Sequence, residues 1–91
     1  MSAPATVVMY ATAWCPYCQR ARALFASKGV RYTEINVEAT PGARDEMRAR
    51  SVRSSVPQIF IDERHIGGFD ETQALDEQGK LDPLLAGTAS A

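Results

Sequence analysis

Hydrophobic positions along the chain form short blocks whose spacing changes from strand-like to helix-like and back. The run VVMY at 7–10 is continuously apolar and rich in strand-forming residues, which is typical of a strand buried on both faces. Residues 16–28 carry apolar side chains at helical spacing, with Pro16 suited to the first turn and Gly29 to the C-terminal cap. The segment VRYTEINV at 30–37 predicts a second strand. Strand, helix and strand within about 30 residues form a βαβ unit, so we expect parallel strands joined by a right-handed crossover.

The second half of the chain predicts further helices and strands, separated by glycine and proline. Pro41 and Gly42 open one helix, and Gly79 closes another. In chain order we expect a helix over 43–51, a strand over 58–61, a turn over 62–65, a short strand over 66–68, a helix from Asp70 or Thr72 to Gln78, and a last helical turn beginning at Asp82–Pro83.

One edge of the expected sheet collects several polar and glycine-rich segments. If the third strand lies antiparallel beside the first and the fourth beside the third, three loops meet there: 14–15, 55–57 and 67–70. In α/β sheets, ligand sites form at such an edge. The turn with His65 would lie at the opposite edge, roughly 15 Å away at ~3.3 Å per residue. We therefore interpret His65 as a solvated turn residue.

Composition and charge narrow the class of protein. The 91 residues predict one domain over 1–91 with loose ends at 1–5 and 86–91. The net charge of −1 argues against a nucleic-acid or anionic-membrane partner. No run reaches the roughly 18 apolar residues of a membrane span. The start MSAPATVVMY lacks the basic and apolar regions of a signal peptide, so we expect a cytoplasmic protein.

Cys15 and Cys18 carry the candidate chemistry. A Cys-x-x-Cys pair that follows a strand and opens a helix in a βαβ unit strongly indicates a redox dithiol. Cys15 falls at the helix N-terminus, whose partial positive charge stabilises the thiolate that attacks disulfides. Cys18 lies one turn further in, nearer the core and within reach of a mixed disulfide on Cys15. We expect Cys15 to be the nucleophile and Cys18 the resolving thiol.

Other uses of the two cysteines have less support. A zinc site needs four ligands, and only His65 remains as a further soft ligand, so we expect no metal in one chain. A purely structural disulfide is rare in the cytosol. A cluster shared between two chains and outside thiols stays open.

The remaining aromatic and charged residues have structural interpretations. We assign Tyr10, Phe25, Phe60 and Ile61 to the core. The stretch RDEMRAR at 44–50, with Arg53 beyond it, is interpreted as a solvated helix face in which Glu46 and Arg50 form an i,i+4 pair.

Three motifs give the chain a resemblance to the glutaredoxins. CPYC at 15–18, SSVP at 54–57 and GGFDE at 67–71 have the order and spacing found in that family, and the match runs from about Thr6 to Leu85. The resemblance implies an α/β, thioredoxin-like fold: a four-stranded mixed sheet flanked by helices in the order β-α-β-α-β-β-α. It also implies a cis Val56–Pro57 bond and glutathione as reducing co-substrate, with no tightly bound cofactor. The implied partners are disulfide-containing or glutathionylated proteins.

The resemblance also assigns contacts to glutathione. Tyr17 matches the aromatic residue beside the glutathione sulfur, and the Val56 backbone matches the partner of the cysteinyl unit. Asp70 and Glu71 match positions at the γ-glutamyl end, and Arg44 matches one that faces the glycine carboxylate. The full set expected to bind glutathione is Tyr17, Arg44, Ser55, Val56, Pro57, Gly68, Asp70 and Glu71.

Two departures from the family pattern keep alternatives open. Thr12 stands where many relatives carry a lysine that contacts the glycine carboxylate, and Trp14 precedes Cys15 as it more often does in thioredoxins. We expect a glutathione-dependent oxidoreductase that reduces protein–glutathione mixed disulfides and protein disulfides. The alternatives are a redoxin that depends on thioredoxin reductase, or a dimer that bridges an iron–sulfur cluster through Cys15 and two glutathiones. Pro16 weighs against the dimer, because cluster-binding relatives often have a smaller residue there.

Overall fold

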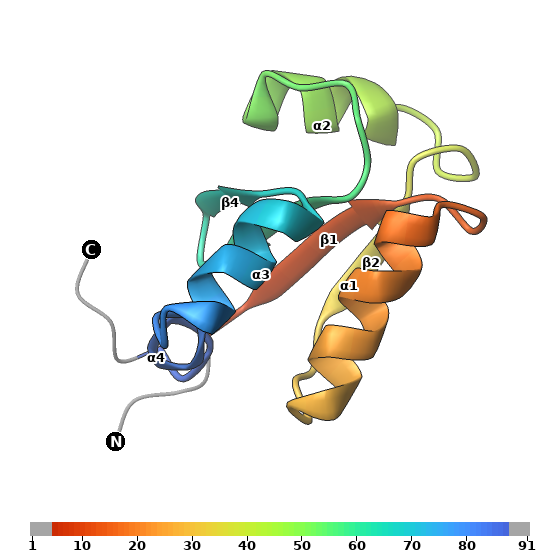
Figure 1. Ribbon diagram of the computed structural model, residues 1–91. Coiled ribbons are helices and arrows are strands. Elements are labelled where there is room, and N and C mark those ends of the chain that lie inside the picture. Colours follow the sequence, from red (N-terminus) through yellow and green to blue (C-terminus); the bar gives the residue numbers. More distant parts are fainter. Residues whose placement is uncertain (1–4, 88–91) are drawn as a thin grey trace.

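Helices cover both faces of a four-stranded mixed sheet in the computed structural model, which describes residues 5–87 (Figure 1). The order β-α-β-α-β-β-α agrees with the fold class that the resemblance implies, and one further short helix follows. The elements are β1 (Val7–Ala11), α1 (Pro16–Ser27), β2 (Thr33–Asn36), α2 (Ala43–Ser51), β3 (Gln58–Ile61), β4 (Arg64–Gly67), α3 (Phe69–Glu77) and α4 (Leu81–Leu85).

The strands lie in the order β2-β1-β3-β4. β1 pairs with β2 in parallel, whereas the β1–β3 and β3–β4 pairs are antiparallel. Tyr10 pairs with Gln58, and Ile59 pairs with Gly67. The end of β1, the start of β3 and the end of β4 therefore share one edge of the sheet, as predicted.

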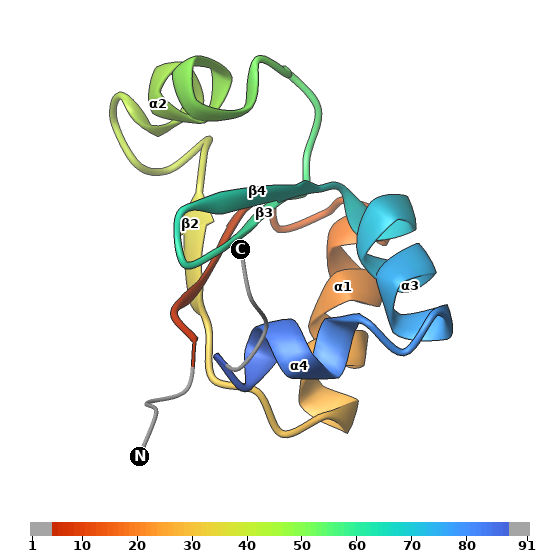
Figure 2. The ribbon, with the colours of Figure 1, turned by 90° about the vertical axis from the view of Figure 1, so that its left-hand side faces the viewer.

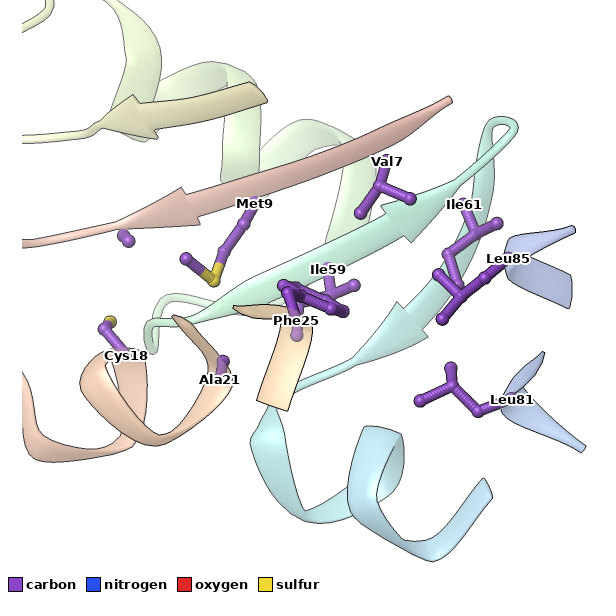
Figure 3. Packing of buried hydrophobic residues seen from close by; sticks show 10 residues of the cluster. Val7, Met9, Cys18, Ala21, Phe25, Ile59, Ile61, Leu81 and Leu85 are labelled. Carbon is purple, nitrogen blue, oxygen red and sulfur yellow. The ribbon is translucent and has the colours of Figure 1, made fainter. Parts of the chain in front are cut away.

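The two faces of the sheet have separate hydrophobic cores. Figures 1 and 2 show α1, α3 and α4 on one face and α2 on the other. Because successive strand residues point to opposite faces, β1 and β3 contribute to both cores. The larger cluster, shown in part in Figure 3, contains Val7, Met9, Ala11, Cys18, Ala21, Phe25, Ile59, Ile61, Leu81 and Leu85. The cluster beneath α2 contains Tyr10, Val37, Ala43, Met47 and Phe60.

α2 is attached to the sheet by one large apolar side chain and one polar network. Met47 is fully buried between α2 and the sheet. The Tyr10 hydroxyl donates to Glu46 Oε2 at 2.7 Å and accepts from Arg50 Nη1 at 2.8 Å. The expected Glu46–Arg50 pair is thus bridged by a tyrosine from β1, because the buried ring brings its hydroxyl out between the two side chains.

The hairpin between β3 and β4 is tighter than the sequence analysis expects. Its turn consists of Asp62 and Glu63, whose φ angles are 50° and 68°. Two consecutive positive φ values are typical of a two-residue hairpin turn. β4 therefore begins at Arg64 rather than at residue 66, and His65 lies in a strand instead of a turn.

Other boundaries also shift. β2 begins at Thr33 rather than at 30, because the Val30 N–H donates to Phe25 O at 3.0 Å and so belongs to the turn that ends α1. α3 begins at Phe69, before the expected Asp70 or Thr72, and α4 begins one residue before Asp82.

Part of each expected loose end is bonded to the fold. The Ala5 N–H donates to Leu85 O at 3.1 Å, while the N–H groups of Ala86 and Gly87 donate to carbonyls of α4. These three residues are therefore not loose. Residues 1–4 and 88–91, the rest of the expected ends, lie outside the described residues.

We predict that Met47→Ala destabilises the protein by about 2–5 kcal/mol, since it leaves a cavity beneath α2. The matched control is Arg48→Ala on the exposed side of the same helix. The Arg48–Asp45 ion pair spans 3.9 Å and is exposed, so its loss should change stability by less than about 0.5 kcal/mol. Urea unfolding measures both, and equal effects would contradict this account of α2.

We also predict that Val52→Gly stabilises the protein. Val52 caps the C-terminus of α2 at φ 60°, and the residue is 89% exposed. A β-branched residue is strained in this left-handed region, and glycine relieves the strain at a smaller entropic cost. We expect a gain of about 0.5–1 kcal/mol in urea unfolding, whereas a loss would show that the Val52 side chain makes stabilising contacts.

Candidate active site

A hollow lies at the shared edge of the sheet, beside Cys15. We call it the edge hollow. The residues that line it are Tyr17, Arg53, Ser55, Val56, Pro57, Gln58, Gly68, Phe69, Asp70 and Glu71. The Cys15 thiol donates to the Val56 carbonyl across 3.7 Å, which joins the start of α1 to the wall of the edge hollow.

The two cysteines have different surroundings. Cys15 is the N-cap of α1 and is half-buried, whereas Cys18 is fully buried among core residues of α1 and β1 (Figure 3). Both are free thiols. Burial raises the pKa of the Cys18 thiol to about 11, although a hydrogen bond to the Thr12 backbone opposes the shift. Cys18 is therefore protonated at neutral pH, and only Cys15 meets the surface.

The segment before Cys15 is held by a side chain that the sequence analysis did not single out. Arg22 Nη2 donates to Thr12 O at 2.9 Å. The same guanidinium makes two hydrogen bonds to Glu34 on β2, at 2.6 and 2.7 Å. Arg22 thus links α1, β2 and the loop that leads to Cys15.

Ser55, Val56 and Pro57 form one wall of the edge hollow. The Val56–Pro57 bond is cis, as the resemblance implies. Among the described residues, no acceptor receives the Val56 N–H. The wall therefore presents a free N–H and a weakly bonded carbonyl from a single residue.

The opposite wall is the start of α3. The Glu71 carboxylate accepts from the Gly68 N–H at 3.0 Å and forms an ion pair with Arg53. Arg53 is the largest cause of a lowered Glu71 pKa. A Cβ on Gly67, whose φ is 122°, would stand 2.5 Å from Glu71 Oε1. The Glu71 side chain therefore fills the space beside Gly67.

The structure brings most of the predicted glutathione-binding residues together. Arg44, in the first turn of α2, does not line the edge hollow, whereas the other seven predicted residues do. Arg53, Gln58 and Phe69 also line the edge hollow, although the resemblance did not assign them to it. Arg53 and Gln58 flank the SSVP motif directly, and Phe69 lies within GGFDE. Their proximity to these motifs could have identified them as lining residues.

The prediction for His65 is wrong. His65 is half-buried, and its ring is tilted against that of Phe60 with the two centroids 5.0 Å apart. Its Nε2 lies 2.7 Å from Gln58 Oε1. A register shift between Ile59 and Phe60 and the short turn set His65 opposite Phe60, so its side chain reaches back toward the edge hollow. The expected distance between His65 and the edge hollow was too large, because it counted residues along the strand. The imidazole instead reaches from β4 across to Gln58 on β3.

Residues 5–87 also lack the features of a metal site and of a membrane span. No three His, Cys, Asp or Glu side chains gather there in a way that could hold a metal ion. None of the helices in this part of the chain has the length and apolar character needed to cross a bilayer.

Comparison with known proteins agrees with the geometry. The glutaredoxin family model matches residues 7–66. Glutaredoxin 3 of Escherichia coli K12 is 53% identical over 81 residues, which cover 89% of this chain and 98% of that protein. The solution structure of a Brucella melitensis glutaredoxin matches with a TM-score of 0.83 at 46% identity, over 99% of this chain and 98% of the other. The crystal structure of a buckwheat glutaredoxin–glutathione complex matches with a TM-score of 0.84 at 28% identity, over 94% and 83% of the two chains. With its CPYC motif at a helix start beside a cis-proline wall, the chain belongs to the glutaredoxin family.

Proposed function

We propose that the protein is a glutathione-dependent thiol–disulfide oxidoreductase in which Cys15 is the nucleophile and Cys18 the resolving thiol. The observation that carries the proposal is the contrast between the two sulfurs at one helix start. Cys15 meets the surface beside the edge hollow, whereas Cys18 is fully buried with a raised pKa. Only one of the two can open a disulfide on another molecule.

Reduction of a protein–glutathione mixed disulfide needs Cys15 alone. The Cys15 thiolate attacks the glutathione sulfur, a Cys15–glutathione disulfide forms, and the protein leaves as a thiolate that takes up a proton. A second glutathione thiolate then attacks the glutathione sulfur of that disulfide. Oxidised glutathione leaves, and the Cys15 thiolate returns.

Reduction of a protein disulfide uses both cysteines. Cys15 attacks one sulfur of the substrate and forms a mixed disulfide with the protein. Cys18 attacks the Cys15 sulfur and its proton passes to the departing substrate thiolate, which releases the reduced protein and leaves a Cys15–Cys18 disulfide. The raised pKa keeps Cys18 protonated in the reduced protein. Two glutathione molecules then reduce the pair.

The edge hollow supports a specific pose for glutathione. The Val56 N–H and carbonyl can pair with the extended cysteinyl unit, as a strand pairs with a sheet edge. The N–H groups at the start of α3, a helix of nine residues, suit the γ-glutamyl carboxylate. Asp70 is exposed there and suits the ammonium group. Glu71 instead serves the protein itself, because its carboxylate is taken by Gly68 and Arg53.

Arg53 is the cation that we assign to the glycine carboxylate of glutathione. It lines the edge hollow, and its side chain is 48% exposed although it pairs with Glu71. Thr12 supplies no cation, and Arg44 lies outside the lining. Arg53 therefore takes over a role that the resemblance gave to Arg44.

The proposal extends to partners and compartment. Disulfide-containing and glutathionylated proteins are the substrates that the chemistry requires. We place the protein in the cytoplasm, where glutathione keeps dithiols of this kind reduced.

Two serine variants test the roles of the cysteines. In an assay with a small glutathione mixed disulfide, glutathione, glutathione reductase and NADPH, Cys15→Ser should abolish turnover, because no nucleophile remains. Cys18→Ser should retain this turnover and lose the reduction of protein disulfides. Turnover by Cys15→Ser, or an unchanged reduction of protein disulfides by Cys18→Ser, would overturn the assignment.

Two matched arginine variants test the glutathione pose. Arg53→Gln should raise the Michaelis constant for the mixed disulfide about five-fold, because a charge-assisted hydrogen bond is lost and Glu71 then repels the bound carboxylate. Arg44→Gln removes an equal charge outside the edge hollow and should change the constant less than about two-fold. A larger effect at Arg44 would mean that the glycine carboxylate lies against α2.

The exposure of Trp14 favours one second candidate function. Trp14 is 87% exposed directly before Cys15, so a protein that docks on Cys15 would contact it. Thioredoxin reductase is then an alternative electron donor. The same assay with thioredoxin reductase in place of glutathione and its reductase distinguishes the two donors, and turnover with that enzyme alone would replace the glutathione route.

A further inference from the structure

Gln58 is a fully buried amide whose two ends bind different parts of the protein. Its Nε2 donates to Ser55 O at 2.9 Å and approaches Ser55 Oγ at 3.3 Å. Its Oε1 lies 2.7 Å from His65 Nε2. Gln58 is 0% exposed and opens β3, while Ser55 lies in the wall of the edge hollow. A continuous hydrogen-bond chain therefore runs from His65 on β4 through Gln58 to Ser55.

The direction of this chain follows from the acceptors. A backbone carbonyl can only accept, so the amide NH₂ of Gln58 must face Ser55 O. The amide oxygen then faces His65 and needs a donor, so Nε2 of the imidazole carries a proton. Burial, followed by the charge of Arg53, lowers the His65 pKa. The ring is therefore neutral at pH 7, with its single proton on the nitrogen that faces Gln58.

The chain also determines where the Val56 N–H points. The peptide unit between Ser55 and Val56 is trans, and the N–H and C=O of a planar trans unit point in opposite directions. Because Gln58 holds the Ser55 carbonyl inward, the Val56 N–H is turned the other way. That N–H has no acceptor among the described residues, and Val56 lines the edge hollow.

We propose that His65 is a positioning residue: through the buried amide of Gln58 it locks the Ser55–Val56 peptide so that the Val56 N–H is presented to the cysteinyl unit of the bound substrate. The inference rests on the proposed function, since it concerns the same edge hollow. It gives a role to a histidine that touches neither cysteine and carries no proton in the reaction. Without the His65 donor, the Gln58 amide can turn and release the Ser55 carbonyl.

Paired substitutions at His65 test the proposal by kinetics. His65→Phe keeps an aromatic ring beside Phe60 and removes the donor, so the Michaelis constant for a small glutathione mixed disulfide should rise about five-fold at nearly constant kcat. His65→Gln restores a side-chain N–H at similar reach and should return the constant to within about two-fold of the original. Arg64→Gln, an exposed neighbour on β4, is the control and should have no effect. Equal constants for His65→Phe and the unaltered protein, or no rescue by His65→Gln, would overturn the proposal.

Gln58→Met provides a second route should His65→Phe not fold. It removes the amide and its donors at similar volume, and it should raise the same Michaelis constant as much as His65→Phe does. In the Gln58→Met background, His65→Phe should add nothing, because both changes break one chain. Additive effects would show that His65 acts independently of Gln58.

A spectroscopic measurement separates this inference from the proposed function. In the ¹⁵N-labelled, reduced protein without ligand, the Val56 amide resonance should move in His65→Phe and return in His65→Gln. The measurement needs no catalysis, so it decides the positioning role even if glutathione turnover is absent and the proposed function fails. A Val56 resonance that does not move in His65→Phe would overturn the inference, whatever the kinetics show.

Discussion

The antiparallel pairing of β1 with β3 is the interaction on which the rest of the site depends. The pairing sets Tyr10 opposite Gln58, so the loop that leaves β1 toward Cys15 lies next to the SSVP segment that enters β3. Because the side-chain period of a strand is two, a slip of one residue would turn Gln58 and Phe60 to the other face. The pairing therefore determines both which side chains form each core and which backbone groups lie beside Cys15.

Burial then separates two chemically identical side chains. One helical turn lies between Cys15 at the N-cap of α1 and Cys18 in the core. Loss of solvation keeps Cys18 protonated, since an anion is costly in apolar surroundings. In the proposed reaction the first sulfur therefore opens the substrate disulfide, and the second attacks the mixed disulfide that results. The order of the proposed reaction follows from where the helix meets the sheet.

Both walls of the edge hollow are held by polar groups of the protein. Glu71 binds the Gly68 N–H and Arg53, so it fixes the start of α3 against the segment before SSVP. In the opposite wall, Gln58 binds the Ser55 carbonyl and is itself bonded to His65. Within residues 5–87, every buried side-chain nitrogen and oxygen has a hydrogen-bond partner. A ligand consequently meets walls whose buried side chains are already held in place by hydrogen bonds.

The sequence by itself determined the elements, their order and the cysteine pair that we propose as the redox site. Continuous apolar runs identified the buried strands, and the CPYC, SSVP and GGFDE motifs located the three loops that converge. It could not determine contacts that depend on lateral pairing and side-chain reach. His65 on Gln58, Arg53 on Glu71 and the Tyr10 hydroxyl between Glu46 and Arg50 join residues that lie 7 to 40 positions apart. Only the tertiary structure decided these contacts, because hydrophobic spacing specifies which face a residue occupies but not which side chain of the next strand or helix lies within hydrogen-bond distance.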